Sequence, residues 1–259
     1  MKALHIAATG MKAQELNVEV ISNNVANMRT TGFKRQRADF QDLLYQNLRR
    51  MGTDTSNAGT IVPTGVQIGS GVKTASTTRI MSQGNLEQTN KETDVAIRGE
   101  GFFQIQMPDG TTAYSRDGSF ERDANGTLVT VDGFTIEPGI VIPDNGRDLT
   151  ISSDGTVQVT VDGASVNLGQ IQLARFVNKA GLEAIGDNLF LQTDASGAAQ
   201  VGNPGENSFG NLQQNFLEMA NVDAVTEIAD LISAQRAYEM NSRIIKAADD
   251  MYSTTTNLR

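Results

Sequence analysis

Both ends of this 259-residue chain carry an apolar seam that repeats every seven residues. The residues at this spacing are Leu4, Met11, Val18 and Val25 near the N-terminus, and Leu231, Tyr238, Ile245 and Tyr252 near the C-terminus. A seven-residue period places such side chains on one narrow face of an α-helix. A face of this kind needs a partner, because an isolated helix is only marginally stable in water. The seams therefore predict two long terminal helices that pack against something else.

The N-terminal helix is expected over residues 3–27, where it would be roughly 36 Å long. Ile21 belongs to a second apolar row of this helix. No glycine or proline interrupts residues 11–31, and Gly32 is a plausible stop, because glycine adopts the left-handed conformation that ends many helices.

The C-terminal helix is expected over residues 223–252, with a length of roughly 45 Å. Asp223 is a credible N-cap, and Glu227 places negative charge in the first turn, where the helix dipole favours it. Asn241 is a polar point beside the seam, of the kind that fixes register between helices. The Ser/Thr run at 253–256 is expected to fray. An adjacent apolar row is expected at Ala237, Ile244 and Met251.

The centre of the chain has the texture of an antiparallel β domain. Seven Asp-Gly or Asn-Gly dipeptides punctuate it, at 109–110, 117–118, 125–126, 132–133, 145–146, 154–155 and 162–163. These dipeptides suit type I′ hairpin turns. Short β-rich runs lie around them, at 95–97, 102–105, 127–131, 156–161 and 189–191. Residues 156–161 alternate apolar and polar side chains, as a half-buried strand does.

These patterns predict an α+β chain with three parts. Residues 1–34 and 213–259 would form a helical domain, with the terminal helices paired as a coiled-coil-like layer, and residues 73–212 a β-rich outer domain. Residues 35–72 would be an extended linker, rich in Gly, Thr and Ser over 51–72. Phe40, Leu43 and Leu44 also fit one helical face. From the residues alone, a globular protein with two surface helices and an assembling subunit remain equally open.

Composition and charge limit the partners that are expected for this chain. The formal net charge of −9 repels phosphate, so nucleic acid is not an expected partner. A basic cluster at Arg29, Lys34, Arg35 and Arg37 is expected either to pair with acidic groups of neighbouring subunits or to be solvated. No apolar stretch is long enough to span a membrane, and Met1–Ile6 does not begin a secretory signal.

No catalytic, cofactor or metal site is predicted. The chain has no cysteine, and its one histidine, His5, would lie at a fraying helix start. Residues 123–126 partly match a calcium loop but lack the later bidentate glutamate, so a hairpin turn is expected there. The glycines at 65–71 and 99–101 lack the Gly-Lys-Ser/Thr ending of a phosphate loop.

Several longer motifs resemble the bacterial flagellar rod and hook family. They are ISNNVAN at 21–27, TGFKR at 31–35, DVAIRGEGFF at 94–103, YSRDGSF at 114–120, ANVD at 220–223 and LISAQRAYEMN at 231–241. This resemblance implies a non-enzymatic subunit of the flagellar basal body, with paired terminal helices forming an inner tube and the β domain facing outward. It also implies a helical homopolymer that transmits torque, exported through the flagellar type III apparatus without a cleaved signal peptide.

Within that family, residues 35–46 and the segment ending at 65–72 favour the distal rod over the proximal rod or the hook. The rod-specific residues would be Arg35, Phe40, Leu43, Leu44 and Tyr45. One departure is NFLE at 215–218, where the family more often carries a glycine. The implied partners are further copies of the chain, proximal rod proteins, the hook protein, the surrounding P and L rings and the export apparatus.

The subunit interface is expected on the terminal seams. Its residues would be Leu4, Met11, Val18, Ile21, Val25, Leu231, Tyr238, Asn241, Ile245 and Tyr252. Two other classes remain as alternatives, a secreted β-rich binding module or adhesin and an enzyme that uses two carboxylates. The first predicts a soluble ligand and no polymer, and the second a cleft with two facing acids.

Overall fold

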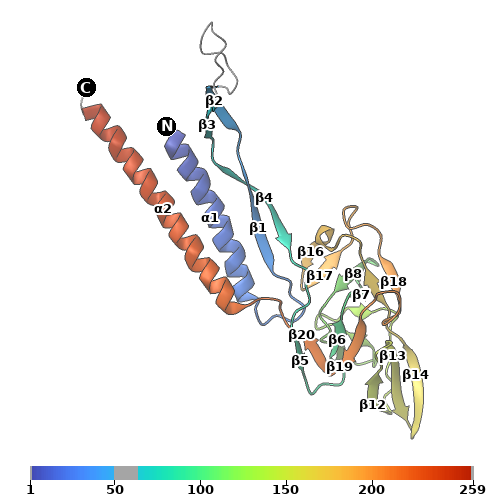
Figure 1. The fold of residues 1–259 in the computed structure, drawn as a ribbon. Coiled ribbons are helices and arrows are strands. Elements are labelled where there is room, and N and C mark those ends of the chain that lie inside the picture. The colour runs from blue at the N-terminus through green and yellow to red at the C-terminus, as the bar shows by residue number, and fades with distance from the viewer. Residues whose placement is uncertain (1, 50–63, 258–259) are drawn as a thin grey trace. The chain divides into compact units, whose positions relative to one another are not determined.

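The computed structural model describes residues 2–49 and 64–257 and has an α+β fold (Figure 1). Its contacts divide the chain into two compact units, each built from separate stretches of sequence. The helical unit comprises residues 1–25, 36–78 and 224–259, and the β unit comprises 26–35 and 79–223. Both terminal helices therefore belong to one unit, together with residues that the sequence assigned to a linker.

The two terminal helices are α1, Lys2–Ala26, and α2, Ala224–Asn257. Their predicted existence and starting points are confirmed. The helix α2 runs beyond the expected end at residue 252, through residues 253–256 to Asn257. Thr254 Oγ1 donates a hydrogen bond of 2.6 Å to the carbonyl of Asp250, so a hydroxyl expected to compete with the helix bonds to it instead.

Gly32 does not end the first helix. The helix stops at Ala26, and Gly32 lies six residues further on with φ +68°. A Cβ at this glycine would lie 2.6 Å from the backbone nitrogen of Asp117. Gly32 is therefore required by a close approach of two backbone segments within the β unit, and not by a helix cap.

Residues 36–49 and 66–79 form paired strands. β1, Gln36–Asp42, pairs with β4, Val72–Arg79, and β2, Tyr45–Arg49, pairs with β3, Val66–Gly69. The alternative that Phe40, Leu43 and Leu44 share a helical face is therefore wrong. We call these two strand pairs, β1 with β4 and β2 with β3, the ribbon. The ribbon lies beside α1 (Figure 1). Val72 N donates a hydrogen bond of 3.3 Å to Thr9 Oγ1 of that helix. Residues 50–63 lie outside the described part of the chain.

The β unit is antiparallel throughout its registered pairs. Its main sheet has the order β16-β17-β8-β7-β11-β10-β9, with β15 pairing both β7 and β18. These strands are β7 Phe102–Gln106, β8 Thr112–Ser115, β9 Glu121–Arg122, β10 Leu128–Val129, β11 Thr135–Ile136, β15 Leu173–Arg175, β16 Glu183–Gly186, β17 Leu189–Leu191 and β18 Gln200–Gly202.

Three smaller sheets and one short helix complete the unit. β12, Gly146–Ile151, β13, Thr156–Val161, and β14, Ala164–Gln170, form a three-stranded sheet, and η1 spans Lys179–Gly181. The two remaining pairs join distant parts of the chain, β6 Val95–Arg98 with β19 Asn211–Gln214, and β5 Leu86–Gln88 with β20 Phe216–Glu218. These pairs attach the segment that leads into α2.

Two apolar cores form around β7. Successive side chains of a strand point to opposite faces, so Phe103 enters one core and Phe102 the other. The first core is mainly aliphatic and includes Val157 and Val159, which confirms the alternation predicted for 156–161. The second is aromatic, and Phe102 and Tyr114 both meet Phe176 edge-on.

The Asp-Gly turns are mostly not of type I′. That type needs positive φ at both central residues, and among the seven dipeptides only Asp162 and Gly163 meet this condition, at +51° and +84°. A second pair with positive φ at both residues, Asp187 and Asn188, joins β16 to β17 and was not predicted.

Candidate assembly site

The described residues contain no group of three or more His, Cys, Asp or Glu side chains that could hold a metal ion. Among the described helices, none is both long and apolar enough to cross a membrane. The features that distinguish this molecule are its exposed surfaces and one buried ionic network.

The helices α1 and α2 contact each other within the helical unit. Asn24 Nδ2 donates a hydrogen bond of 3.1 Å to Glu227 Oε2, and Gly10 lies so close to Asn241 that a Cβ would be 2.9 Å from its Nδ2. Ala234 and Ala248 are buried, whereas Ile244 and Met251 are exposed. The second row of the seam therefore lies three residues before Ala237, Ile244 and Met251, and not at those residues.

The ten predicted interface residues differ in how far the single chain buries them. Ile21 is buried, whereas Tyr238 and Tyr252 are exposed by 42% and 45%. The other seven are half-buried: Leu4, Met11, Val18, Val25, Leu231, Asn241 and Ile245. The pairing of α1 with α2 accounts for part of the seam and leaves the rest accessible.

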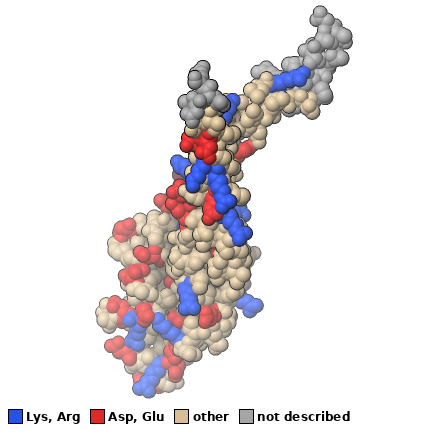
Figure 2. Space-filling view, turned by 90° about the vertical axis from the view of Figure 1, so that its left-hand side faces the viewer, with Lys and Arg blue, Asp and Glu red and all other residues tan. Residues whose placement is uncertain are grey.

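A groove of about 490 Å³ runs between the two helices. Glu15, Val18 and Glu19 of α1 line one side, and Gln235, Tyr238 and Glu239 of α2 line the other. The groove thus combines two apolar side chains with three carboxylates. In Figure 2, acidic and basic side chains lie interleaved with neutral surface along the helices.

The face of α2 that points away from the seam exposes several large apolar side chains among charged ones. Its large exposed apolar side chains are Val225, Ile228, Ile232, Met240 and Ile244, with Val225 77% and Met240 59% exposed. Arg236 and Arg243, also exposed, lie seven residues apart on this face. We call these seven residues the outer ridge of α2.

The ribbon also presents apolar surface, at β2, β3 and the turn before β2. The exposed residues there are Leu44, Tyr45, Leu48, Val66 and Ile68, and Leu44 is 88% exposed. Of the five predicted rod-specific residues, Leu44 and Tyr45 are on this surface, and Phe40 and Leu43 are half-buried nearby. Arg35 is not with them, because it belongs to the β unit. A groove of about 550 Å³ separates Ile68 from Lys2, His5 and Ile6 of α1.

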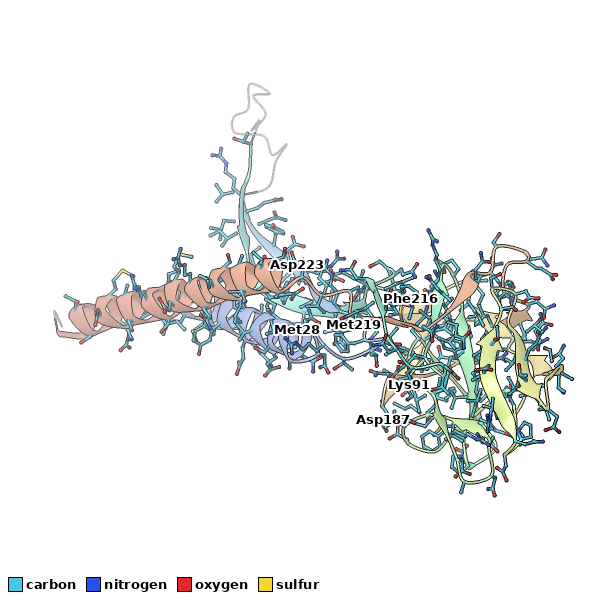
Figure 3. The ribbon with its side chains drawn as sticks, turned by 90° about the horizontal axis from the view of Figure 1, so that it is seen from below. Met28, Lys91, Asp187, Phe216, Met219 and Asp223 are labelled. Atoms are coloured by element: carbon cyan, nitrogen blue, oxygen red, sulfur yellow. The ribbon has the colours of Figure 1, made fainter. Side chains whose placement is uncertain are left out.

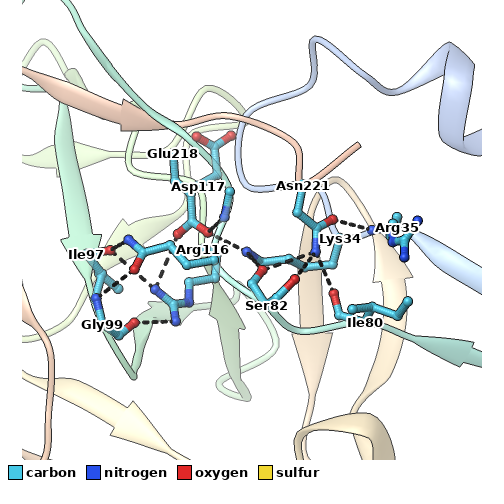
Figure 4. A network of polar contacts seen from close by, with 12 residues as sticks. Lys34, Arg35, Ile80, Ser82, Ile97, Gly99, Arg116, Asp117, Glu218 and Asn221 are labelled. Atoms are coloured by element: carbon cyan, nitrogen blue, oxygen red, sulfur yellow. Dashed lines mark hydrogen bonds and ion pairs between the residues drawn. The ribbon is translucent and has the colours of Figure 1, made fainter. Parts of the chain in front are cut away.

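A buried ionic network lies within the β unit (Figure 4). Glu218 of β20 forms ion pairs with Lys34 through Oε1 and with Arg116 through Oε2, the latter at 3.3 Å. Gly84 N also donates a hydrogen bond of 2.9 Å to Glu218 Oε1. The side chains of Lys34, Arg116 and Glu218 are 1%, 3% and 0% exposed. The network joins three segments that are far apart in sequence.

Backbone carbonyl groups also hold the two cations, in addition to the carboxylate of Glu218. Lys34 Nζ donates to the carbonyl of Ser82 at 2.9 Å, and Arg116 Nη2 donates to the carbonyl of Gly99 at 2.6 Å. Burial lowers the pKa of Lys34 and the pKa of Arg116, because each loses water around its charge. The prediction that Lys34 belongs to a surface basic cluster is wrong, since this side chain is enclosed.

Two asparagines fix the backbone around this network and the ribbon. Asn221 Oδ1 accepts a hydrogen bond from Arg35 N at 2.8 Å, and its Nδ2 donates to the carbonyl of Ile80 at 2.8 Å. Asn24 makes a matching pair with the backbone of Gln36, at 2.8 and 2.9 Å. No role was predicted from the sequence for these two asparagines, Arg116 or Glu218. The asparagines and Arg116 lie in the quoted family motifs, and Glu218 ends the departing segment NFLE.

The departure from the family pattern at 215–218 has a physical explanation. Asn215 has φ +62°, the left-handed conformation that glycine favours and that asparagine tolerates best among other residues. It leads into Phe216 and Met219, which Figure 3 shows on the segment before Asp223 and α2. Asparagine can therefore adopt the backbone conformation that glycine would otherwise supply at this position.

Models of flagellar protein families match most of the chain. Residues 4–34 match the flagella basal body rod protein family, 96–159 the D1 domain of flagellar hook protein FlgE/F/G, and 213–258 the C-terminal part of flagellar basal body rod FlgEFG protein. The flagellar basal-body rod protein FlgG of Caulobacter vibrioides is 58% identical, over 100% of both chains. The chain belongs to the flagellar basal-body rod protein family.

Further rod proteins agree with this membership. FlgG of Agrobacterium fabrum is 53% identical over 98% of this chain and 97% of its own, and FlgG of Bacillus subtilis is 37% identical over 100% and 99%. As a member of this family, the chain is a structural subunit of the flagellar basal body and not an enzyme. The match at both ends includes nearly all of α1 and α2, and thus the groove between them and the outer ridge of α2.

Proposed function

We propose that this rod subunit polymerises helically into the distal rod, a rigid hollow shaft that transmits torque from the motor to the hook. The observation that carries the proposal is the outer ridge of α2. Five large apolar side chains remain exposed there in the single chain. Fully burying one such side chain stabilises a protein by about 1.5–3 kcal/mol. Contact between copies that buries these side chains would therefore be favourable.

The inner layer of this shaft would be made of α1 and α2, paired as a coiled-coil-like layer. Their contacts at Asn24–Glu227 and Gly10–Asn241 support such pairing, and the partly accessible seam residues would complete their burial against neighbouring copies. The ten seam residues named above would then be interface residues. The β unit has its own two cores and would form the outer layer without further support.

The distal position is proposed from the ribbon and the segment around it. An exposed apolar surface lies at residues 44–48 and 66–68, and bracing between subunits is the role that such a surface suits. Its residues are Leu44, Tyr45, Leu48, Val66 and Ile68. A proximal rod or hook position would use the helices in the same way but would not call for this ribbon contact.

The remaining partners follow from the proposed position. They are the proximal rod proteins below, the hook protein above and the P and L rings around the shaft, between the periplasm and the outer membrane. Delivery through the flagellar type III export apparatus completes the proposal. No cofactor or nucleic acid has a role in it.

Electron microscopy of purified protein at rising concentration tests polymerisation, and tubes or helical stacks are expected. A variant lacking residues 51–66, most of which lie outside the described residues, should form softer or bent tubes while its β unit stays folded. A variant shortened at the exposed turn 109–111 is the matched control. Straight, stiff tubes from the 51–66 deletion would contradict the bracing role, and monomers at every concentration would contradict polymerisation.

A further inference from the structure

We propose that the groove between α1 and α2 receives the outer ridge of α2 from a second copy, held by arginine–glutamate pairs. This inference rests on the proposed polymerisation and names the contact that drives it. It requires that the two surfaces match in shape, polarity and charge.

The groove supplies an acidic surface with an apolar floor. Val18 and Tyr238 are its apolar residues, and Glu15, Glu19 and Glu239 are its charged ones. Among the ion pairs of the described residues, none includes any of these three carboxylates. Glu15 and Glu19 lie four residues apart on one face of α1, so their like charges destabilise each other until a cation joins them.

The outer ridge supplies the complementary surface. Arg236 and Arg243 are roughly 10 Å apart along α2, at 1.5 Å per residue, with Met240 between them and Ile232 and Ile244 beside them. Neither arginine has an ion pair within the described part of the chain. Guanidinium groups suit this task because they bind carboxylates through two parallel hydrogen bonds and stay charged.

The two surfaces are different patches of one subunit, so the contact is head-to-tail. Each copy offers its ridge to one neighbour and its groove to another, which builds an open series of subunits and not a closed dimer. Gln235, Tyr238 and Glu239 line the groove while Arg236 and Arg243 belong to the ridge. Because both patches lie at the same level of α2, the neighbours would stand side by side.

Charge reversal on each side separately gives a sharp test. The groove variant E15K/E19K has a net positive groove, because two lysines then stand beside Glu239, and a basic ridge. The ridge variant R236E/R243E has an acidic groove and an acidic ridge. Either variant alone should raise the concentration needed for polymerisation by about tenfold or more, as sedimentation measures. An equimolar mixture of the two should polymerise again, because each ridge then meets a groove of the opposite charge.

The matched control is D132K/E183K, which makes the same charge change at exposed residues of the β unit. It should polymerise like the parent, and circular dichroism should show unchanged helix content in all variants. Polymerisation of either variant alone at the parental concentration would overturn the inference while leaving the proposed function intact, and so would a mixture no better than its components. A parent chain that never polymerises would overturn both.

Discussion

Removing the charge of Glu218 should be among the most damaging single changes to this protein. Glu218→Gln keeps the size of the side chain and an oxygen for the hydrogen bond from Gly84. It removes the only carboxylate that forms an ion pair with Lys34 and Arg116 among the described residues. Two buried cations would then face a neutral amide, and the amide's own N–H groups cannot accept a hydrogen bond from either.

The expected loss follows from burial. Removing one partner of a buried ion pair costs about 3–5 kcal/mol, because the other charge stays buried without compensation. A domain is commonly stable by only about 5–15 kcal/mol, so this change approaches the whole margin. Lys34→Met should cost less, because Glu218 retains Arg116 and Gly84 N and no cation is left unpaired.

Guanidinium unfolding of the full chain, followed by circular dichroism, measures both variants. The order of stability should be parent, Lys34→Met, then Glu218→Gln. Glu121→Gln is the control, because its pair with Lys91 is exposed and such pairs contribute about 0–1 kcal/mol. If Glu218→Gln lost less than about 1 kcal/mol, or less than Lys34→Met, the claim that this carboxylate neutralises two buried cations would be refuted.

Two further changes test separate features. Gly32→Ala should lower the free energy of unfolding by more than about 2 kcal/mol, because Gly32 has φ +68° and an added Cβ would meet the backbone of Asp117. Gly133 has φ +85° but open space around it, so Gly133→Ala should lower it by only about 1 kcal/mol in the same unfolding assay. Hydrogen bonds from Thr156 lower the pKa of Asp154 below 3.8, so its stabilising effect is present above that pH and is lost as the pH falls through the lowered pKa. The difference in Tm between the parent and Thr156→Val should therefore shrink between pH 5 and about pH 2, and an unchanged difference would contradict this account.

The terminal helices could be predicted because their pattern is long and local. A seven-residue apolar repeat over 20 or more residues has few alternatives, and the starts of both helices were found within two residues. The ribbon could not be predicted in this way. β2 pairs with β3 across residues 50–65, and Leu44, Tyr45 and Leu48 remain exposed, so no burial pattern marks these strands.

The buried network was missed for a different reason. Lys34 lies beside Arg35 and near Arg37 in the sequence, which is typical of a solvated basic cluster, and a lysine is rarely buried without a partner. Its partner, Glu218, is 184 residues away, and no local pattern connects the two. The β-rich runs, by contrast, were found because alternation and turn residues are short-range signals.

The position of Asn24 determines the order in which the contacts of α1 form as the chain folds. Its amide binds the backbone of Gln36, 12 residues away, and the carboxylate of Glu227, 203 residues away. In a chain that emerges N-terminus first, the nearby bond forms early, and the other waits until nearly the whole sequence is out. Until then the helix α1 can pack against the ribbon but not against α2, which has not yet emerged. A subunit cut short before Glu227 would lack the α2 side of the groove and all of the outer ridge except Val225, so incomplete chains would be excluded from growth.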